Sequence, residues 1–423
     1  MFRKSFAVVA SAMFLATGVS FARVPAISTL GTPDQFKDVV VPQAKTKAAT
    51  WTIMVYVNAK NNLEEYGLKD VNEMEMVGSN DKVNVVAELG RIRGYSSVEG
   101  NWTGSRRYLV QKDNDASNIT SPVLVDMPKT DMGDWKHLVD FAQWAKAAYP
   151  AKNYMLIVWN HGAGWIKNSK GKGISYDDES GNHMTTPQLA QALKEIGGLQ
   201  VYGSDACLMQ MASVDYEIKD YVDYIVGSEE TEPGDGYTYD TFLAQVNASD
   251  LSSLAVGKAA VDAYTDHYVS IQQGATQSLV KTAAMPGFIA ALDAFVDATM
   301  ATNDKTSVKT ARSKTVSYAY SDNKSLSHFV NNLLGITTDE KVKTTGAALV
   351  KYTDNELVVH NRTNTGTSSW DNKNYGNSKG LAIYLPSYNF NATYKELQFA
   401  KNSKWADFIQ WINAKDTTPV PAQ

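Results

Sequence analysis

Short apolar runs alternate with amphipathic stretches through the first half of the chain. Runs of strand length, each bounded by polar or turn residues, lie at 52–57 (TIMVYV), 82–89 (KVNVVAEL), 154–160 (YMLIVWN), 199–205 (LQVYGSD) and 224–228 (YIVGS). Between them, apolar residues recur at helical spacing in 63–77, 135–150, 185–196 and 208–221. This order predicts an α/β fold, with a mostly parallel sheet covered by helices on both faces.

Local signals support these boundaries. Thr185 or Thr186 can cap the helix over 185–196, and Pro187 suits its first turn. The segment 106–112 (RRYLVQK) predicts a further strand at an antiparallel edge of the sheet. Beyond Asp250 the alternation is less regular and ends in a late strand over 379–386 (KGLAIYLP). We therefore expect a main α/β domain over 50–250, a C-terminal part over 251–415 and a tail over 416–423.

The N-terminus has the pattern of an export signal. Arg3 and Lys4 precede an apolar run over 6–19, and Ser20-Phe21-Ala22 supplies small residues at the positions that a signal peptidase inspects. The run is shorter than the roughly 20 apolar residues that span a bilayer, and we expect no later spanning segment. The sequence predicts a signal peptide over 1–22, a leader or pro-segment over 23–49, and a secreted or periplasmic protein.

Charge and cysteine usage narrow the function classes. A formal net charge of −5, without any run of Lys or Arg, argues against a nucleic-acid partner, and we expect a monomer. Cys207 is the single cysteine, so it cannot form an internal disulfide. A free thiol is an oxidation liability in an exported protein, which favours a chemical role for this one.

Two predicted strands end in residues that suit one reaction. His161 follows the strand over 154–160, and Cys207 follows the strand over 199–205, directly before a predicted helix. Parallel strands collect reactive groups at their carboxyl ends, so neighbouring strands would place the two side by side. A helix N-terminus and a cationic imidazole lower the pKa of a thiol, which predicts an activated nucleophile. The backbone N–H groups of Gly162 and Cys207 would then form an oxyanion pocket.

Four blocks of sequence resemble the clostripain (C11) cysteine peptidases, which are relatives of caspases, legumain and gingipains. They are YMLIVWNHGAGW, YDDESGNHMTTPQLAQAL, YGSDACLMQMASVDYEI and SEETEPGDGYTY, in this order. The segment from Trp51 to Ser79 also resembles the start of that domain. The resemblance implies a caspase-like three-layer sandwich, with a C-terminal extension packed on it. It also implies His161 as the catalytic histidine, Cys207 as the nucleophile, and cleavage after a basic residue.

The family's acidic S1 positions match Asp205 and Asp235. A carboxylate on a partly desolvated pocket floor would pair with Arg or Lys and reject neutral side chains. Both residues also have a structural interpretation, because Asp favours turns and caps.

The resemblance also implies a zymogen that is cut between the histidine and cysteine strands. The polar segment 166–180 carries Lys167, Lys170 and Lys172, and we expect self-cleavage there, after Lys172 or Lys170. Calcium is a further cofactor that the resemblance suggests. Asp177, Asp178 and Glu179 are acidic but lack a calcium-loop pattern, and Lys60 replaces an expected acid, so no metal site is predicted.

Two other function classes compete with a peptidase. A catalytically inactive binding protein on the same fold would be expected to lack His161 or Cys207, and both are present. An esterase of the α/β-hydrolase type is suggested by NHGAGW, which is typical of an oxyanion segment. That class needs a G-x-S-x-G elbow, and the sequence contains none. The histidines also lack the H-x-x-x-H spacing of a zinc protease.

Overall fold

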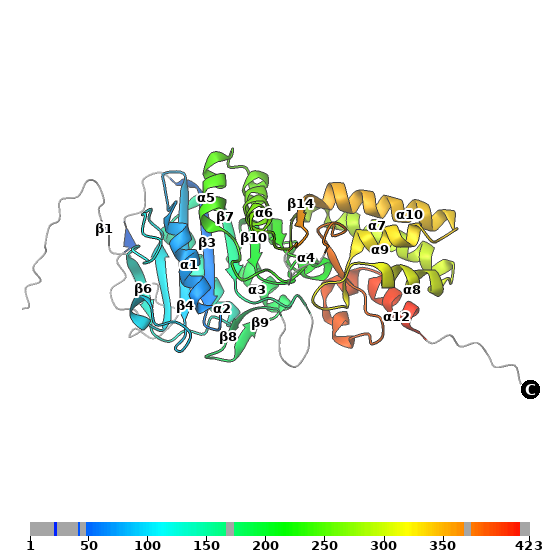
Figure 1. The fold of residues 1–423 in the computed structure, drawn as a ribbon, viewed down its shortest axis with the longest axis horizontal. Helices are drawn as coiled ribbons and strands as arrows, with labels where there is room; N and C mark the ends of the chain where they lie inside the picture. Colours follow the sequence, from blue (N-terminus) through cyan, green and yellow to red (C-terminus); the bar gives the residue numbers. More distant parts are fainter. Residues whose placement is uncertain (1–20, 23–40, 43–47, 166–172, 368–373, 415–423) are drawn as a thin grey trace, which may run out of the picture.

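A computed structural model of the chain describes residues 21–22, 41–42, 48–165, 173–367 and 374–414. Its centre is a nine-stranded sheet in the order β14-β12-β11-β10-β7-β3-β4-β5-β6 (Figure 1). The five strands from β11 to β4 are parallel, and the pairs at both ends are antiparallel. The strands of this sheet are β3 (Ala49–Ala59), β4 (Val83–Arg91), β5 (Gly104–Leu109), β6 (Val123–Met127), β7 (Ala151–Trp159), β10 (Leu199–Asp205), β11 (Val222–Gly227), β12 (Ala275–Lys281) and β14 (Val358–Asn364).

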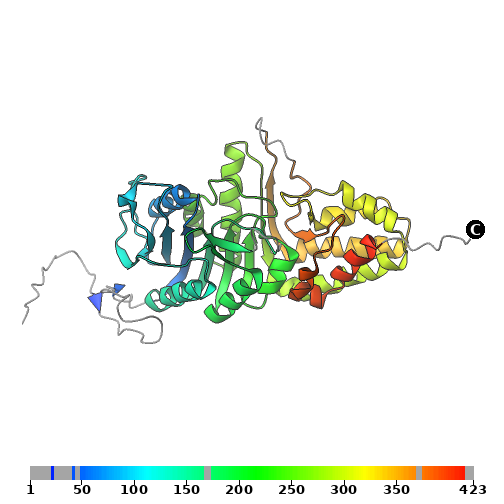
Figure 2. The ribbon, with the colours of Figure 1, turned by 90° about the horizontal axis from the view of Figure 1, so that it is seen from below.

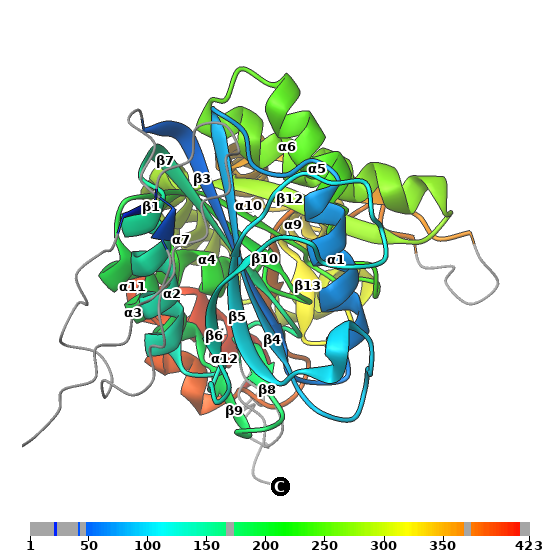
Figure 3. The same ribbon diagram turned by 90° about the vertical axis from the view of Figure 1, so that its left-hand side faces the viewer.

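Helices cover both faces of the sheet, as the alternating pattern predicts. One face packs against α1 (Glu64–Glu75), α5 (Tyr239–Ala248) and α6 (Ser253–Ser270). The other packs against α2 (Trp135–Ala148), α3 (Thr186–Ile196) and α4 (Ala212–Ile218). Figure 3 shows α1 and α5 on the opposite side of the strands from α2 and α3. Successive residues of a strand point to opposite faces, so Met54 and Tyr56 join one core while Ile53 and Val55 join the other.

The C-terminal part adds a layer of helices, and its strands β12 and β14 belong to the central sheet. Its helices gather beyond β14, at the end of the molecule where the chain terminates (Figure 2). They are α7 (Met285–Ala301), α8 (Lys305–Lys314), α9 (Leu326–Leu334), α10 (Glu340–Tyr352), α11 (Gln398–Asn402) and α12 (Trp405–Asn413), with a π-helical turn over Thr353–Leu357. Short 3₁₀ turns cover Glu99–Asn101, Thr282–Ala284 and Ala392–Glu396, and two-stranded pairs join β1 (Phe21–Ala22) to β2 (Val41–Pro42), β8 (Ile174–Asp177) to β9 (Asn182–Met184) and β13 (Asn323–Ser325) to β15 (Ala382–Tyr384).

Three sequence expectations need correction. Strand β5 is antiparallel as expected, but β6 lies outside it and forms the edge. The late strand is the short β15, which pairs with β13 away from the main sheet. Among the described residues, one helical stretch, Thr282–Ala301, is long and apolar enough to cross a membrane. Half of its most apolar window is buried, as in a core helix. The third correction concerns the helix after Cys207.

That helix, α4, begins at Ala212 and not directly behind Cys207. Residues between β10 and α4 form a turn, in which Leu208 has a positive φ of 63°. The backbone N–H of Leu208 donates to the carbonyl of Glu230 (3.0 Å), and that of Gln210 donates to Ser228 (3.0 Å). These bonds use N–H groups that a helix starting at Cys207 would have left free to act on the thiol. The predicted helix-terminus effect on Cys207 is therefore absent.

Candidate active site

Strand register places His161 and Cys207 side by side. Strands β7 and β10 are parallel neighbours, and Trp159 is paired with Asp205. His161 and Cys207 each follow two residues later, so they lie at the same level beyond the sheet. The backbones also touch: a Cβ added to Gly162 would lie 2.3 Å from the carbonyl oxygen of Cys207. Only glycine permits this approach of the two backbones.

The sulfur of Cys207 is half-buried and enclosed by backbone groups. The N–H of Glu232 donates to it at 3.4 Å, and the thiol faces the carbonyl oxygen of Glu232 at 3.9 Å. Burial, together with the charge of Glu232, raises the pKa of the Cys207 thiol to about 11. The N–H groups of Glu232, Gly162 and Cys207 act in the opposite direction. The thiol pKa is thus higher than the sequence predicted, because burial and an acid outweigh the N–H groups.

His161 is held by a side chain that sequence reasoning missed. Its Nε2 lies 2.8 Å from Oδ1 of Asn62, in the turn between β3 and α1. Burial lowers the pKa of His161, and the charge of Asp178 works against that shift. The resting site therefore combines a neutral imidazole with a neutral thiol at neutral pH. Such a pair works by proton transfer from the thiol to the imidazole as the substrate is attacked.

Asp205 lies beneath the nucleophile in a group of buried acids. Its carboxylate accepts hydrogen bonds from the hydroxyl of Tyr239 (2.8 Å) and the N–H of Tyr237 (3.3 Å). Burial raises the pKa of Asp205 to about 6, while a hydrogen bond with Glu232 lowers it. Burial also raises the pKa of Glu232 well above its ordinary value, and the charge of Asp205 adds to this rise. The two carboxyl groups therefore share a proton.

Glu232 is the second acid of this group. Its Oε1 accepts from the side chain of Gln277 at 3.2 Å. Sequence reasoning missed Glu232, although it lies in the quoted block SEETEPGDGYTY. The signal that could have identified it is this family block, in which Glu232 lies three residues before Asp235, the acid that the resemblance did single out.

Asp235 lies in the same loop but is already paired. Its carboxylate contacts Nζ of Lys69 on α1 at 3.0 Å and Nε2 of His267 on α6 at 3.1 Å. Partial burial would raise the pKa of Asp235, but the hydrogen bonds from Lys69 and His267 lower it overall. These contacts tie the loop to two helices. The role of Asp235 in substrate recognition stays a prediction, with a tether as its structural alternative.

The acidic cluster that the resemblance suggested for calcium contains a lysine. Nζ of Lys60, which is fully buried, contacts Asp177 at 3.2 Å and Glu179 at 2.6 Å, and it donates to the carbonyl of Thr130. An ammonium thus lies among the oxygens that a cation would need, so these residues do not fit a calcium ion. The described residues contain no group of three or more His, Cys, Asp or Glu suited to a metal. Lys170 and Lys172, the predicted processing residues, lie outside the described residues.

Replacing Lys60 with methionine is expected to destabilise the fold by about 3–5 kcal/mol, because Asp177 would remain as a buried, unpaired carboxylate. Chemical denaturation with a tryptophan-fluorescence readout measures this. The matched control is Lys343→Met, which removes an exposed pair with Glu340 and should leave the midpoint unchanged. Equal midpoints for the Lys60 variant and the wild type would show that the buried pair adds nothing.

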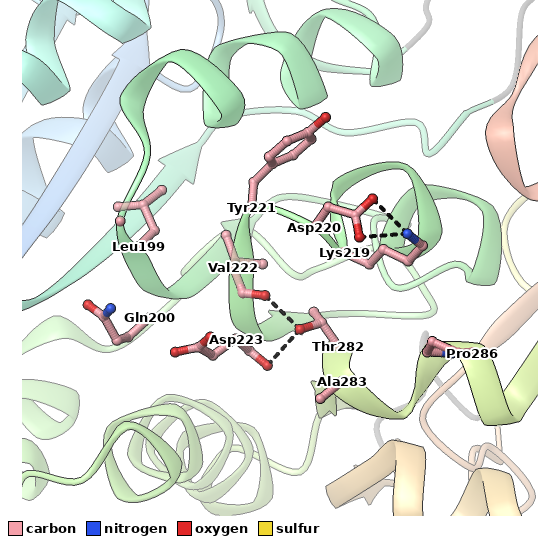
Figure 4. Close-up of a pocket in the computed structure, with 11 residues that line it drawn as sticks. Leu199, Gln200, Lys219, Asp220, Tyr221, Val222, Asp223, Thr282, Ala283 and Pro286 are labelled. Atoms are coloured by element: carbon pink, nitrogen blue, oxygen red, sulfur yellow. Dashed lines mark hydrogen bonds and ion pairs between the residues drawn. The ribbon is translucent and has the colours of Figure 1, made fainter.

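A surface hollow of about 400 Å³ lies at the opposite end of the strands. Figure 4 shows its lining, which includes Leu199 and Val222, the first residues of β10 and β11. Three of its polar side chains already have partners: Lys219 pairs with Asp220 at 2.7 Å, and the Thr282 hydroxyl donates to the carbonyl of Val222 at 2.6 Å. This hollow is far from His161 and Cys207 along the strands, so it is not part of their site.

Comparison with known proteins decides the family. The model of the clostripain family matches residues 55–416. The chain belongs to the clostripain family. It is 29% identical to clostripain of Hathewaya histolytica over 230 residues, which cover 48% of this chain and 43% of that protein. The match thus spans less than half of clostripain.

Solved structures show the same fold. A secreted C11 cysteine protease of Bacteroides thetaiotaomicron, in complex with an irreversible peptide inhibitor, superposes with a TM-score of 0.65 at 20% identity. The alignment covers 86% of this chain and 99% of that one. An inactive zymogen C11 protease of Parabacteroides distasonis gives a TM-score of 0.64 at 19% identity, over 85% and 99% of the two chains. The predicted caspase-like α/β fold of the clostripain family is therefore confirmed.

Proposed function

We propose that this chain is an exported cysteine endopeptidase that cleaves after Arg or Lys through His161 and Cys207. The observation that supports this most directly is the β7–β10 register, which brings an imidazole and a sulfur to one edge of the sheet. Membership of the clostripain family supports the same chemistry. The C11 cysteine protease of Bacteroides thetaiotaomicron with a similar fold is secreted, which agrees with the export signal predicted here.

The reaction follows from the groups around the sulfur. His161 takes the thiol proton as Cys207 attacks the carbonyl carbon of the scissile bond, and the oxyanion accepts hydrogen bonds from the N–H groups of Gly162 and Cys207. His161 then gives its proton to the departing amine, leaving a thioester on Cys207. Water, deprotonated by His161, attacks the thioester and releases the second product.

The buried acids beside the nucleophile support a basic P1 residue. Asp205 and Glu232 hold two carboxyl groups that share a proton, and Asp70 adds a third, whose Oδ1 has no partner within the described residues. A guanidinium or ammonium entering here would replace the shared proton and pair with both acids. We propose Asp205 and Glu232 as the floor of the P1 pocket, and Asp235 as a further candidate on its rim.

Labelling with an iodoacetamide probe tests the proposal. Cys207 should be alkylated, and a peptidyl chloromethyl ketone with Arg or Lys at P1 should block the label, whereas the same peptide ending in Glu should not. His161→Ala should slow the inhibitor but keep iodoacetamide access. Labelling that no peptide blocks would instead favour an inactive binding protein. An esterase would be revealed by hydrolysis of simple esters without any dependence on a peptide.

The pKa of the thiol predicts how alkylation depends on pH. With that pKa raised to about 11, the thiolate fraction and the alkylation rate should rise about tenfold per pH unit through pH 7–9. Stopped iodoacetamide reactions followed by mass spectrometry measure the rate at Cys207, the single cysteine. A rate that is already constant below pH 7 would mean a preformed thiolate and would contradict the neutral pair.

A further inference from the structure

Three adjacent strands of the sheet each lead into a residue at or beside the candidate active site. The order β3-β7-β10 is continuous in the sheet, and the chain leaves these strands toward Asn62, His161 and Cys207 respectively. Asn62 Oδ1 lies 2.8 Å from His161 Nε2. The amide of Asn62 thus contacts His161 from the β3 side, whereas β10, which leads to the sulfur, lies on the other side of β7.

The turn that carries Asn62 is fixed on both sides. Asn61, which is buried, donates from Nδ2 to the carbonyl of Tyr176 (2.9 Å) and accepts from the N–H of Leu63 (2.9 Å). One residue before Asn61, the buried ammonium of Lys60 binds Asp177 and Glu179. The side chain of Asn62 itself is exposed and packs into no core. Its backbone is therefore rigid while its amide is free to serve His161.

The chemistry of an amide suits this position. An oxygen acceptor at Nε2 requires the imidazole proton on Nε2, which leaves Nδ1 free of a proton and able to accept one from the thiol. A neutral amide orients the ring without adding the negative charge by which a carboxylate would favour imidazolium. Asp178, in the turn after β8, is the charged group that raises the pKa of His161. The other titratable group of the proposed reaction is the thiol of Cys207.

We propose that Asn62 is the positioning residue of the active site: it holds the His161 ring and fixes its tautomer, so that Nδ1 exchanges the proton with Cys207. This inference rests on the proposed function, since it assigns the partner of the catalytic histidine. It adds a third residue to the proposed pair of His161 and Cys207.

Kinetics of Asn62→Ala and Asn62→Asp test the assignment. Asn62→Ala should lower kcat by about 10- to 100-fold with KM nearly unchanged, because the ring loses its orientation but no substrate contact. Asn62→Asp should recover much of kcat. Its carboxylate should raise the pKa of His161, so the acidic limb of the pH profile should move upward by about one unit. The denaturation midpoints should stay at the wild-type value, because Asn62 is exposed.

The control is Asn402→Ala, another exposed asparagine with one side-chain hydrogen bond, to the carbonyl of Gln398 (2.8 Å), which should leave kcat unchanged. Asn62→Ala with wild-type kcat at every pH, or with a change in KM alone, would overturn the assignment. So would an Asn62→Asp variant whose pH profile does not move. A wild type that has no more activity than His161→Ala would instead refute the proposed function.

Discussion

Replacing Cys207 with alanine should reduce the hydrolysis of peptides with Arg or Lys at P1 by at least about 10⁴-fold. The sulfur makes the covalent bond in the proposed reaction, and no other cysteine exists to replace it. Initial rates on a fluorogenic peptide measure the loss. The double variant with His161→Ala should be no slower than Cys207→Ala alone, because residues that act in one step do not contribute additively. Residual activity above about 1% would point to another nucleophile.

The same variant tests the predicted self-processing. Wild type purified from cells should run as two fragments on a denaturing gel, whereas Cys207→Ala should run as one intact band. Substituting Lys172 and Lys170 together should also leave the chain intact while keeping His161 and Cys207. A Cys207→Ala protein that is cut equally would assign the cut to another protease.

The second large effect is expected at the P1 pocket. Asp205→Asn and Glu232→Gln should each lower kcat/KM for basic P1 residues by about 10²- to 10³-fold, because a buried cation would lose its counter-charge. Asparagine and glutamine keep the shape of the site, so the reaction itself should survive. Matched peptides with Arg, Lys or norleucine at P1 separate the two effects. Cleavage of the norleucine peptide should stay constant or improve.

Asp235→Asn is the internal comparison for this pocket. Because its carboxylate already pairs with Lys69 and His267, we expect a loss well below that of Glu232→Gln. An equal or larger loss would make Asp235 part of the pocket floor. Basic selectivity that persists in both Asp205→Asn and Glu232→Gln would contradict the proposed floor.

The parallel strands at the centre of the sheet were predictable because buried parallel strands leave a strong signal, whereas β6, β12, β14 and the strand order were not predicted. The predicted strand over 199–205 matches β10, and the predicted helix over 185–196 matches α3 within one residue. The Cys207 helix was misplaced because 208–221 is apolar enough for a helix from its start, while the sequence does not reveal that Leu208 adopts a positive φ. Helix α4 therefore begins only at Ala212, and the expected helix dipole does not act on the thiol.

The site was predictable where chemistry follows a strand end and unpredictable where it depends on contacts across the fold. His161, Gly162 and Cys207 follow from the strand pattern together with the family resemblance. Asn62 is ordinary in sequence, and its position becomes meaningful only when β3 lies beside β7. Glu232 likewise depends on the return of its loop over Asp205. The pKa of the thiol reverses the prediction because burial and a neighbouring acid cannot be read from one segment.

The pairing of β7 with β10 has a consequence for any cut within residues 166–172. His161 would then belong to one polypeptide and Cys207 to the other, joined by the ladder from Met155–Val201 to Trp159–Asp205. The mature protein would be a heterodimer whose subunits arose from one gene product. This ladder would join its two chains together with ion pairs such as Lys60–Asp177 and Lys69–Asp235, and separating the chains would take the imidazole away from the sulfur.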